Sequence, residues 1–289
     1  MLSFKTKTVK YLSDCFKYTI SPFNKILPLI HLSKCWVACI GILTLLLIAQ
    51  CYQLSPYFQV NSSHPALTML PKQIIWAWQR PEDLRFLPSN VGVAYVATSI
   101  NLENNQAYVY PRMHPLLVNA NTRIIPVVHI DASWRKPPTL NDEQLEAIVK
   151  ELMYAATLGN SNTVQLDFEV RRSQQNFLKV VVTKARQSLP KTTALSMTAL
   201  ASWCAGDNWL SKMPADEIIP MAFRMAAGDV AIRQLLAKRG HFKPENCQTA
   251  IGTALDEPIV ILDSTNIRRY YFSPKPWTHA LWQQQNAQK

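Results

Sequence analysis

The 289-residue chain contains only seven glycines, and it has no Gly-rich phosphate loop, no nucleophile elbow and no Cys/His dyad. The sequence therefore offers no support for a phosphate-loop enzyme or for these kinds of nucleophilic catalysis. It also lacks internal repeats and low-complexity segments, while hydrophobic residues make up 48% of it. Such a chain can bury a sizeable core, as one large α/β domain or two small ones.

Long basic clusters are missing after the first part of the chain, although the formal net charge is +11. Residues 1–34 hold six lysines and one aspartate and so account for +5 of that charge. In the rest, no run of basic residues is longer than Arg171-Arg172 or Arg268-Arg269, and no nucleic-acid-binding motif is present. These features argue against a nucleic-acid partner and leave open a weak preference for anionic glycans or lipid headgroups.

Residues 35–52 carry no charged side chain and are apolar enough to enter a bilayer, although the run is near the short end for a span. We expect a transmembrane helix there, preceded by a basic cytoplasmic segment at 1–34. A cleaved signal peptide is the alternative, but its basic lead-in would be long. Processing as a lipoprotein at Cys51 is disfavoured because Gln50 replaces the expected small residue.

The lysines before this helix are expected to stay in the cytoplasm, which predicts a single-pass protein whose remainder faces the periplasm or the extracellular side. Residues 53–71 are rich in Ser, Asn and Pro without apolar periodicity, so they are predicted to be a tether. The domain is expected to span residues 72–289.

Only two cysteines, Cys204 and Cys247, belong to the expected outer domain. An oxidising compartment favours a disulfide between them, worth roughly 4 kcal/mol in the loop-entropy model. Two free, buried thiols are the alternative.

Short runs of β-branched and aromatic residues recur along the domain and alternate with helical patterns. The clearest helices are expected at 142–158 and 174–189, after the capping residues Asn141 and Ser173. The strands are expected at residues 74–78, 91–97, 123–130, 163–169, 194–200, 217–223, 248–254 and 268–272. Eight such strands predict an α/β fold, a compact (β/α)8 TIM-like barrel. Short connections after strands one and seven predict an incomplete outer ring of helices.

The fourth expected strand ends in acidic side chains, which an ordinary core strand would not carry. Alternation places Gln165, Asp167 and Glu169 on one side of this strand. Barrel enzymes keep their catalytic groups at the carboxyl ends of strands, so Glu169 is a candidate general acid and Asp167 its electrostatic partner. The alternative is a structural ion-pair network with Arg171, Arg172 or Arg224.

Other candidate residues also follow strands. Flat apolar faces with one polar handle suit sugar rings, and most of the tryptophans fall at or after strand ends, although each could be a bulky cap on the core. His129 and Asp131 lack a second histidine in a metal-binding spacing, so the sequence predicts no metal and no cofactor. The expected substrate-binding residues are Trp76, Trp78, His129, Asp131, Trp203, Arg224, Glu257 and Trp277.

Five motifs, QLDFE, SMTALASWC, IIPMAFRM, IGTALDEP and YYFSPKPWT, together resemble domain-of-unknown-function family 3142, over residues 72 to about 278. The resemblance implies a barrel and no known reaction. More distantly, LDFE resembles the end of the strand-four signature of family 18 glycoside hydrolases, which implies that Glu169 is the proton donor. Gln165 stands where that signature carries an earlier Asp, which puts substrate-assisted chemistry on N-acetyl sugars in doubt.

These observations together predict a membrane-anchored barrel that acts on a carbohydrate or envelope glycan. A glycan-binding or envelope-assembly protein without turnover is the alternative, since a fold does not establish a reaction. A purely structural membrane protein would instead expose a large apolar patch away from the mouth.

Overall fold

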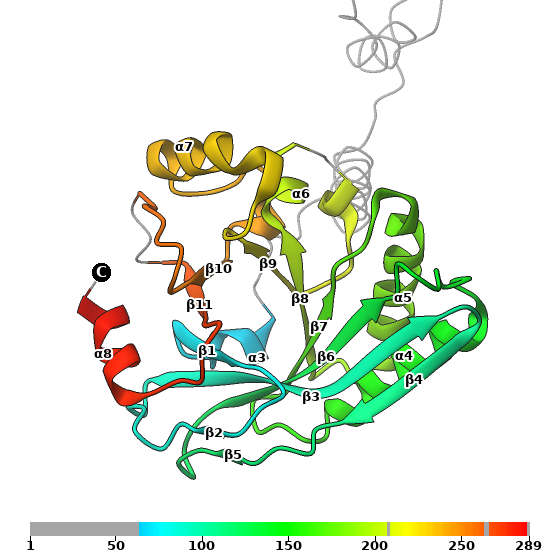
Figure 1. The fold of residues 1–289 in the computed structure, drawn as a ribbon, viewed down its shortest axis with the longest axis horizontal. Coiled ribbons are helices and arrows are strands. Elements are labelled where there is room, and N and C mark those ends of the chain that lie inside the picture. Colours follow the sequence, from blue (N-terminus) through cyan, green and yellow to red (C-terminus); the bar gives the residue numbers. More distant parts are fainter. Residues whose placement is uncertain (1–63, 207–208, 263–265, 288–289) are drawn as a thin grey trace, which may run out of the picture. The chain divides into compact units, whose positions relative to one another are not determined.

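The computed structural model describes residues 64–206, 209–262 and 266–287, which lie in one compact unit, Ser62–Lys289. Eight parallel strands form a closed barrel (Figure 1), because β1 pairs with both β3 and β11. In order around the barrel they are β1 (Gln73–Ala77), β3 (Val91–Glu103), β6 (Ile124–Ala132), β7 (Thr163–Phe168), β8 (Ala194–Leu200), β9 (Glu217–Met221), β10 (Ala250–Ala254) and β11 (Arg268–Phe272). The predicted (β/α)8 TIM-like barrel is confirmed.

The outer ring of helices is incomplete, as the short connections indicated. Within the described residues no helix follows β1, β3 or β10 before the next barrel strand. The longer helices are α4 (Asp142–Ala155), α5 (Gln175–Ser188), α7 (Asp229–Arg239) and α8 (His279–Ala287), with a short α6 (Ala201–Ala205) and the 3-10 turns η1 (Arg172–Gln174), η2 (Trp209–Lys212), η3 (Ala226–Gly228) and η4 (Glu245–Cys247). Figure 1 shows α4 and α5 side by side against β6 and β7.

The predicted cap of α4 is confirmed and that of α5 is wrong. Asn141 Oδ1 accepts a hydrogen bond from the main-chain N–H of Gln144 at 2.9 Å. Ser173, in contrast, lies inside η1, and α5 begins after Gln174 without a side-chain cap. An extra 3-10 turn precedes α5, so the helix begins two residues after Ser173, the predicted cap.

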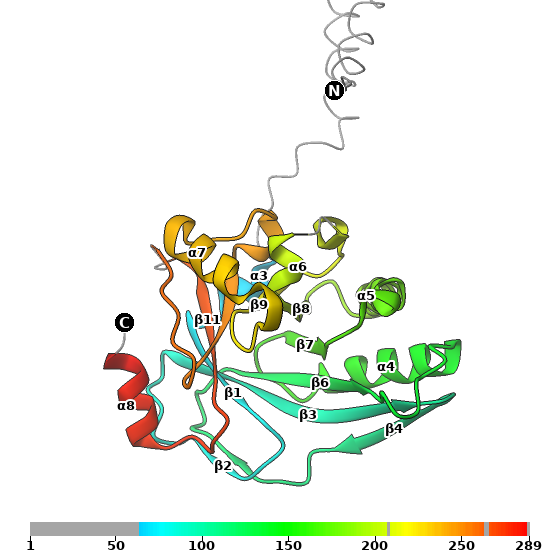
Figure 2. The same cartoon turned by 45° about the horizontal axis from the view of Figure 1, so that its top comes forward.

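Three short strands lie outside the barrel and were not expected. β4 (Gln106–Pro111) runs antiparallel to the far half of β3, and β2 (Glu82–Asp83) pairs with β5 (Leu116–Leu117). As a result β3, β4 and the end of β6 extend beyond the barrel as a twisted sheet with α4 packed on one side (Figure 2).

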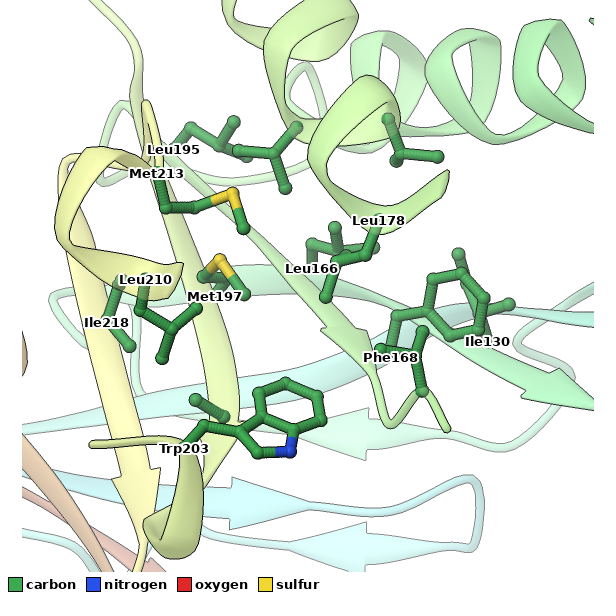
Figure 3. Packing of buried hydrophobic residues seen from close by; sticks show 14 of the residues in the cluster. Ile130, Leu166, Phe168, Leu178, Leu195, Met197, Trp203, Leu210, Met213 and Ile218 are labelled. Atoms are coloured by element: carbon green, nitrogen blue, oxygen red, sulfur yellow. The ribbon is translucent and has the colours of Figure 1, made fainter. Parts of the chain in front are cut away.

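Apolar side chains fill both sides of the barrel wall. The outer side packs against α4, α5 and α6, and Figure 3 shows part of this cluster, including Leu166, Phe168, Leu178 and Trp203. The barrel interior holds a second cluster, which the short helix α3 (Pro65–Thr68) joins through Ala66 and Leu67. Residues 65–71, at the end of the expected tether, thus pack with the barrel, and the predicted segments 1–34 and 35–52 lie outside the described residues.

Two further expectations concern the membrane and the cysteines. Cys204 and Cys247 form the predicted disulfide, and both are buried. No helix in the described part of the chain is long and apolar enough to cross a bilayer.

Candidate active site

Asp167 lies at the carboxyl end of β7, where it is held by neighbours on both sides. Its Oδ2 lies 2.7 Å from Nδ1 of His129 on β6, and its Oδ1 accepts a hydrogen bond of 2.5 Å from the hydroxyl of Thr198 on β8. Parallel pairing causes this arrangement, since His129 stands directly opposite Asp167 in the register of β6 and β7. The Asp167 side chain is 8% exposed and points into the barrel mouth rather than toward the helices.

Glu169 follows the end of β7 by one residue and is exposed to solvent. The protein around its carboxyl still removes part of its hydration, and this desolvation, together with the negative charge of Asp167, raises the pKa of Glu169 above its ordinary value of 4.5. The nearby His129 opposes the shift. Of the two acids, Glu169 is therefore the one prepared to hold a proton that a ligand can reach.

The surrounding acids favour the protonated form of His129. Burial by itself would lower the pKa of the imidazole, but the hydrogen bond and charge of Asp167, with smaller effects from Asp131 and Glu169, raise it above 6.5. The carboxylates of Asp131, Asp167 and Glu169 form a cluster with this imidazole, and the raised pKa of Glu169 makes it the better proton carrier of the cluster.

An aromatic cluster lines the same mouth. Trp78 lies edge-on to His129, with ring centroids 5.9 Å apart. Behind it, Phe272 stacks on Trp76 at 4.7 Å and contacts Phe223 at 4.8 Å. Trp76 and Phe272 are buried, whereas Trp78 and Phe223 are partly exposed. Only the last two present ring surface to a ligand at the mouth in this conformation.

Trp203 and Trp277, the other two predicted sugar platforms, lie away from this cluster. Trp203 is 7% exposed and lies in the outer core (Figure 3). Its ring packs against that of Trp209, with centroids 5.1 Å apart. Trp277 is 3% exposed, and its indole N–H donates to the carbonyl of Trp76. The structure does not bring these two side chains to Asp167. Trp76 is fully buried and supports the mouth from inside.

Arg224 and Glu257 face each other across the ends of β9 and β10. Arg224 has a positive φ of 51°, and its main-chain N–H donates to Oε2 of Glu257 at 2.7 Å. The Arg224 guanidinium also pairs with Asp256 at 3.2 Å. A left-handed conformation is unfavourable for a residue with a side chain, so Glu257 holds this turn in place. In the structure Arg224 pairs with Asp256 and Glu257, and not with Asp167 or Glu169 as the ion-pair alternative predicted.

Asp131 is exposed two residues beyond His129 on β6, on the same face. Its charge contributes to the raised pKa of His129, which places it within the acidic cluster. No group of three or more His, Cys, Asp or Glu side chains in the described ranges is arranged to hold a metal ion.

A polar column continues from this mouth into the barrel. Gln165 is fully buried below Asp167, and its amide donates to the hydroxyl of Ser196, which donates to Oε2 of Glu217. Glu217 forms a buried ion pair with Arg268 at the opposite end. Gln165 is thus part of the interior network, one layer below Asp167.

No family model matches the chain, and no curated protein matches it. Several solved structures are similar to it, among them two enzymes. The spore cortex-lytic enzyme SleL of Bacillus cereus is 12% identical with a TM-score of 0.39, and the match covers 64% of this chain and 52% of the SleL chain. An endo-beta-N-acetylglucosaminidase from Cordyceps militaris, in apo form, is 9% identical with a TM-score of 0.38, and the match covers 74% of this chain and 88% of that enzyme's chain.

The chain spans about half the length of SleL. Both likenesses are too low in TM-score and identity to transfer an activity, a substrate or a catalytic residue. The resemblances to domain-of-unknown-function family 3142 and to family 18 glycoside hydrolases therefore stay predictions from the motifs.

Sequence reasoning missed three residues of this mouth: Thr198, Phe223 and Phe272. Thr198 had a detectable signal, because it alternates with Ser196 and the small polar pair faces one side of a buried strand. The two phenylalanines had none, since a phenylalanine near a strand end is equally typical of either face of a barrel.

Proposed function

We propose that this protein is a membrane-anchored, outward-facing enzyme of the glycoside hydrolase type, with Glu169 as the general acid and Asp167 as its partner. The observation that carries the proposal is the division of roles between two acids at the carboxyl end of one barrel strand. Asp167 has both oxygens engaged by His129 and Thr198, while Glu169 is exposed and has a raised pKa. This is the pairing that protonation of a leaving glycosidic oxygen requires.

In this mechanism Glu169 donates its proton to the bridging oxygen of a sugar bound beside Trp78, and the bond between that oxygen and the anomeric carbon breaks. A water molecule supplies the hydroxyl that adds to the anomeric carbon, and its other proton restores Glu169. The negative charge of Asp167 stabilises the positive charge that develops on the sugar and favours the protonated form of Glu169. Trp78 and Phe223 offer the apolar faces against which a sugar ring stacks. Two residues of extended chain separate the α-carbons of the acids by about 6.5 Å. Side-chain rotamers can bring the carboxyls to either glycosidase separation, so this spacing does not distinguish retention from inversion.

The location rests on separate observations. The charge-free run at 35–52, preceded by lysines, favours an uncleaved anchor with the barrel outside. The disulfide supports an oxidising compartment. Recovery of the full chain in membranes after alkaline washing is expected, and its release into the soluble fraction would contradict the anchor.

The test compares the full chain in detergent with its Glu169→Gln variant on bacterial glycans. We expect product formation to fall by about 10²–10⁴-fold while glycan binding persists, because the amide keeps the shape but cannot donate the proton. The matched control is Glu146→Gln, an acid on the outside of α4. Binding without any product from the unaltered chain would contradict the enzyme and favour the second candidate.

That second candidate is a glycan-binding protein without turnover. It is favoured by Gln165, a neutral side chain below Asp167 that leaves the strand with two acids only.

A further inference from the structure

The sheet that β3, β4 and β6 form beyond the barrel has two faces of different character. Ile100 and Leu102 of β3 are fully buried on the face toward α4. The residues that alternate with them along β3 point to the opposite face of the sheet, which lies on the side of the barrel mouth. In the part of the chain that the structure describes, no helix packs on this mouth-side face, which carries polar and aromatic side chains.

Strand register arranges these side chains in rows that lead to the carboxylates. Tyr110 on β4 stands opposite Ser99 on β3, Ser99 opposite His129 on β6, and His129 opposite Asp167. Partners in register lie on the same face of a sheet, so the row is continuous from an exposed tyrosine to the buried carboxylate. With neighbouring strands about 4.8 Å apart, it spans about 14 Å.

A second row lies one step further from the barrel and repeats the pattern. Tyr108 stands opposite Asn101, and Asn101 opposite Asp131. Tyr108 is 45% exposed and Tyr110 is 50% exposed, and two residues of strand rise separate them by about 7 Å. The face therefore presents two aromatic rings beside a set of hydrogen-bonding side chains.

Hydrogen bonds connect this face to the wall of the mouth. The amide of Gln79, the residue after Trp78, donates to the hydroxyl of Ser99 at 3.0 Å and to the carbonyl of Tyr110 at 3.3 Å. The loop that carries Trp78 is thereby fixed against the first row. A ligand stacked on Trp78 would continue onto Ser99 and Tyr110 without crossing a gap in the protein surface.

We infer that the mouth-side face of β3, β4 and β6, which we call the glycan platform, binds an extended glycan chain of several sugar rings. The inference rests on the proposed function and names its substrate class as a polymer rather than a mono- or disaccharide. Tyrosines that stack on rings, alternating with Asn101, Asp131 and Ser99 that bond to hydroxyls, match a chain of sugars. An apolar protein partner would leave the interleaved carboxylate and amide unpaired.

The test uses the full chain in detergent, in the Glu169→Gln background so that binding is measured without turnover. The probes are the disaccharides and hexasaccharides of β-1,4-linked glucose and N-acetylglucosamine, and sonicated peptidoglycan strands. We expect Tyr108→Ala and Tyr110→Ala each to weaken hexasaccharide binding by about five- to tenfold and to leave disaccharide binding unchanged. Tyr154→Ala, which removes an exposed tyrosine on α4, is the matched control and should change neither.

Several results would overturn the platform, and they differ from those that bear on the enzyme. Failure of every probe to bind, or equal loss of disaccharide and hexasaccharide binding in the tyrosine variants, overturns it. So does a change in oligomeric state by light scattering without a change in glycan binding, because the face would then pair with a second copy through edge strand β4. Wild-type turnover of short and long chains at equal kcat/KM would support the proposed function and overturn the platform.

Discussion

Replacing Arg268 with alanine should destabilise the barrel strongly, because this side chain joins α3 to the interior. Its guanidinium pairs with Glu217 and donates to the carbonyls of Leu67, at 2.5 Å, and Pro71, at 3.1 Å. Burial alone would lower the pKa of Arg268, but the charge of Glu217 raises it overall. In the variant, Glu217 would remain at 1% exposure with only the hydroxyls of Ser196 and Tyr270 to support its charge.

Breaking a buried ion pair by removing one partner costs about 3–5 kcal/mol. For a domain of this size, 1 kcal/mol corresponds to about 2–4 °C in Tm, so we expect a loss of about 6–20 °C. Thermal unfolding of the full chain in detergent, followed by circular dichroism, measures it. The control is Lys184→Ala, which removes an exposed pair with Glu146 and should cost less than about 1 kcal/mol.

The double variant Glu217→Leu, Arg268→Met separates charge from packing. Removing both charges leaves no lone carboxylate in the core, so the double variant should unfold at a higher temperature than Arg268→Ala. If Arg268→Ala melts within the range of Lys184→Ala, the ion pair does not hold α3 in the barrel. If the double variant is the least stable of all, loss of packing rather than a stranded charge is the cause.

Two further predictions concern His129 and the disulfide. Asp167→Asn should lower the pKa of His129, because burial then acts against fewer negative charges, and NMR titration of the imidazole measures it; an unchanged midpoint would mean that Asp167 does not stabilise the proton on His129. Since the folded-state pKa is raised, stability linked to His129 should be fully present below about pH 6.5 and be lost as the pH rises through the higher folded value. Replacing both Cys204 and Cys247 with serine should cost about 4 kcal/mol, given their separation of 43 residues, and lower the Tm by about 8–16 °C. A melting curve identical to that of the oxidised chain would show that the crosslink is not stabilising.

The sequence predicted the barrel well because its strands are short apolar runs with local signals at their ends. All eight were found, and Asp167 lies on the fourth as predicted, whereas that strand ends at Phe168 and leaves Glu169 just beyond it. The tryptophans were harder, since a residue after a strand can turn inward or outward. Trp203 lies in α6, where helix geometry directs it into the outer core, and no periodicity of the preceding strand carries that information.

The hairpin of β3 and β4 could have been recognised from its own residues. Asn104-Asn105 is a turn signal, Asn104 has a positive φ of 48°, and Tyr108 and Tyr110 alternate after it. The predicted strand ended at residue 97 instead. Beyond that point the polar Ser99 and Asn101 look like the start of a loop, although they belong to a strand with one solvent-facing side.

The glycan platform also depends on one residue that no pattern within β3 reveals. Gly92, Ala94 and Val96 face the barrel interior, and unbroken alternation would send Ile100 and Leu102 toward the mouth. A bulge between Val96 and Thr98 adds one residue and reverses the phase, so that Ile100 and Leu102 turn to α4 and Ser99 joins the row of His129. The alternation of side chains along one strand can be read from a sequence. Which face each side chain takes relative to the next strand depends on how the two strands pair. The polar face beside the carboxylates exists because of that single extra residue.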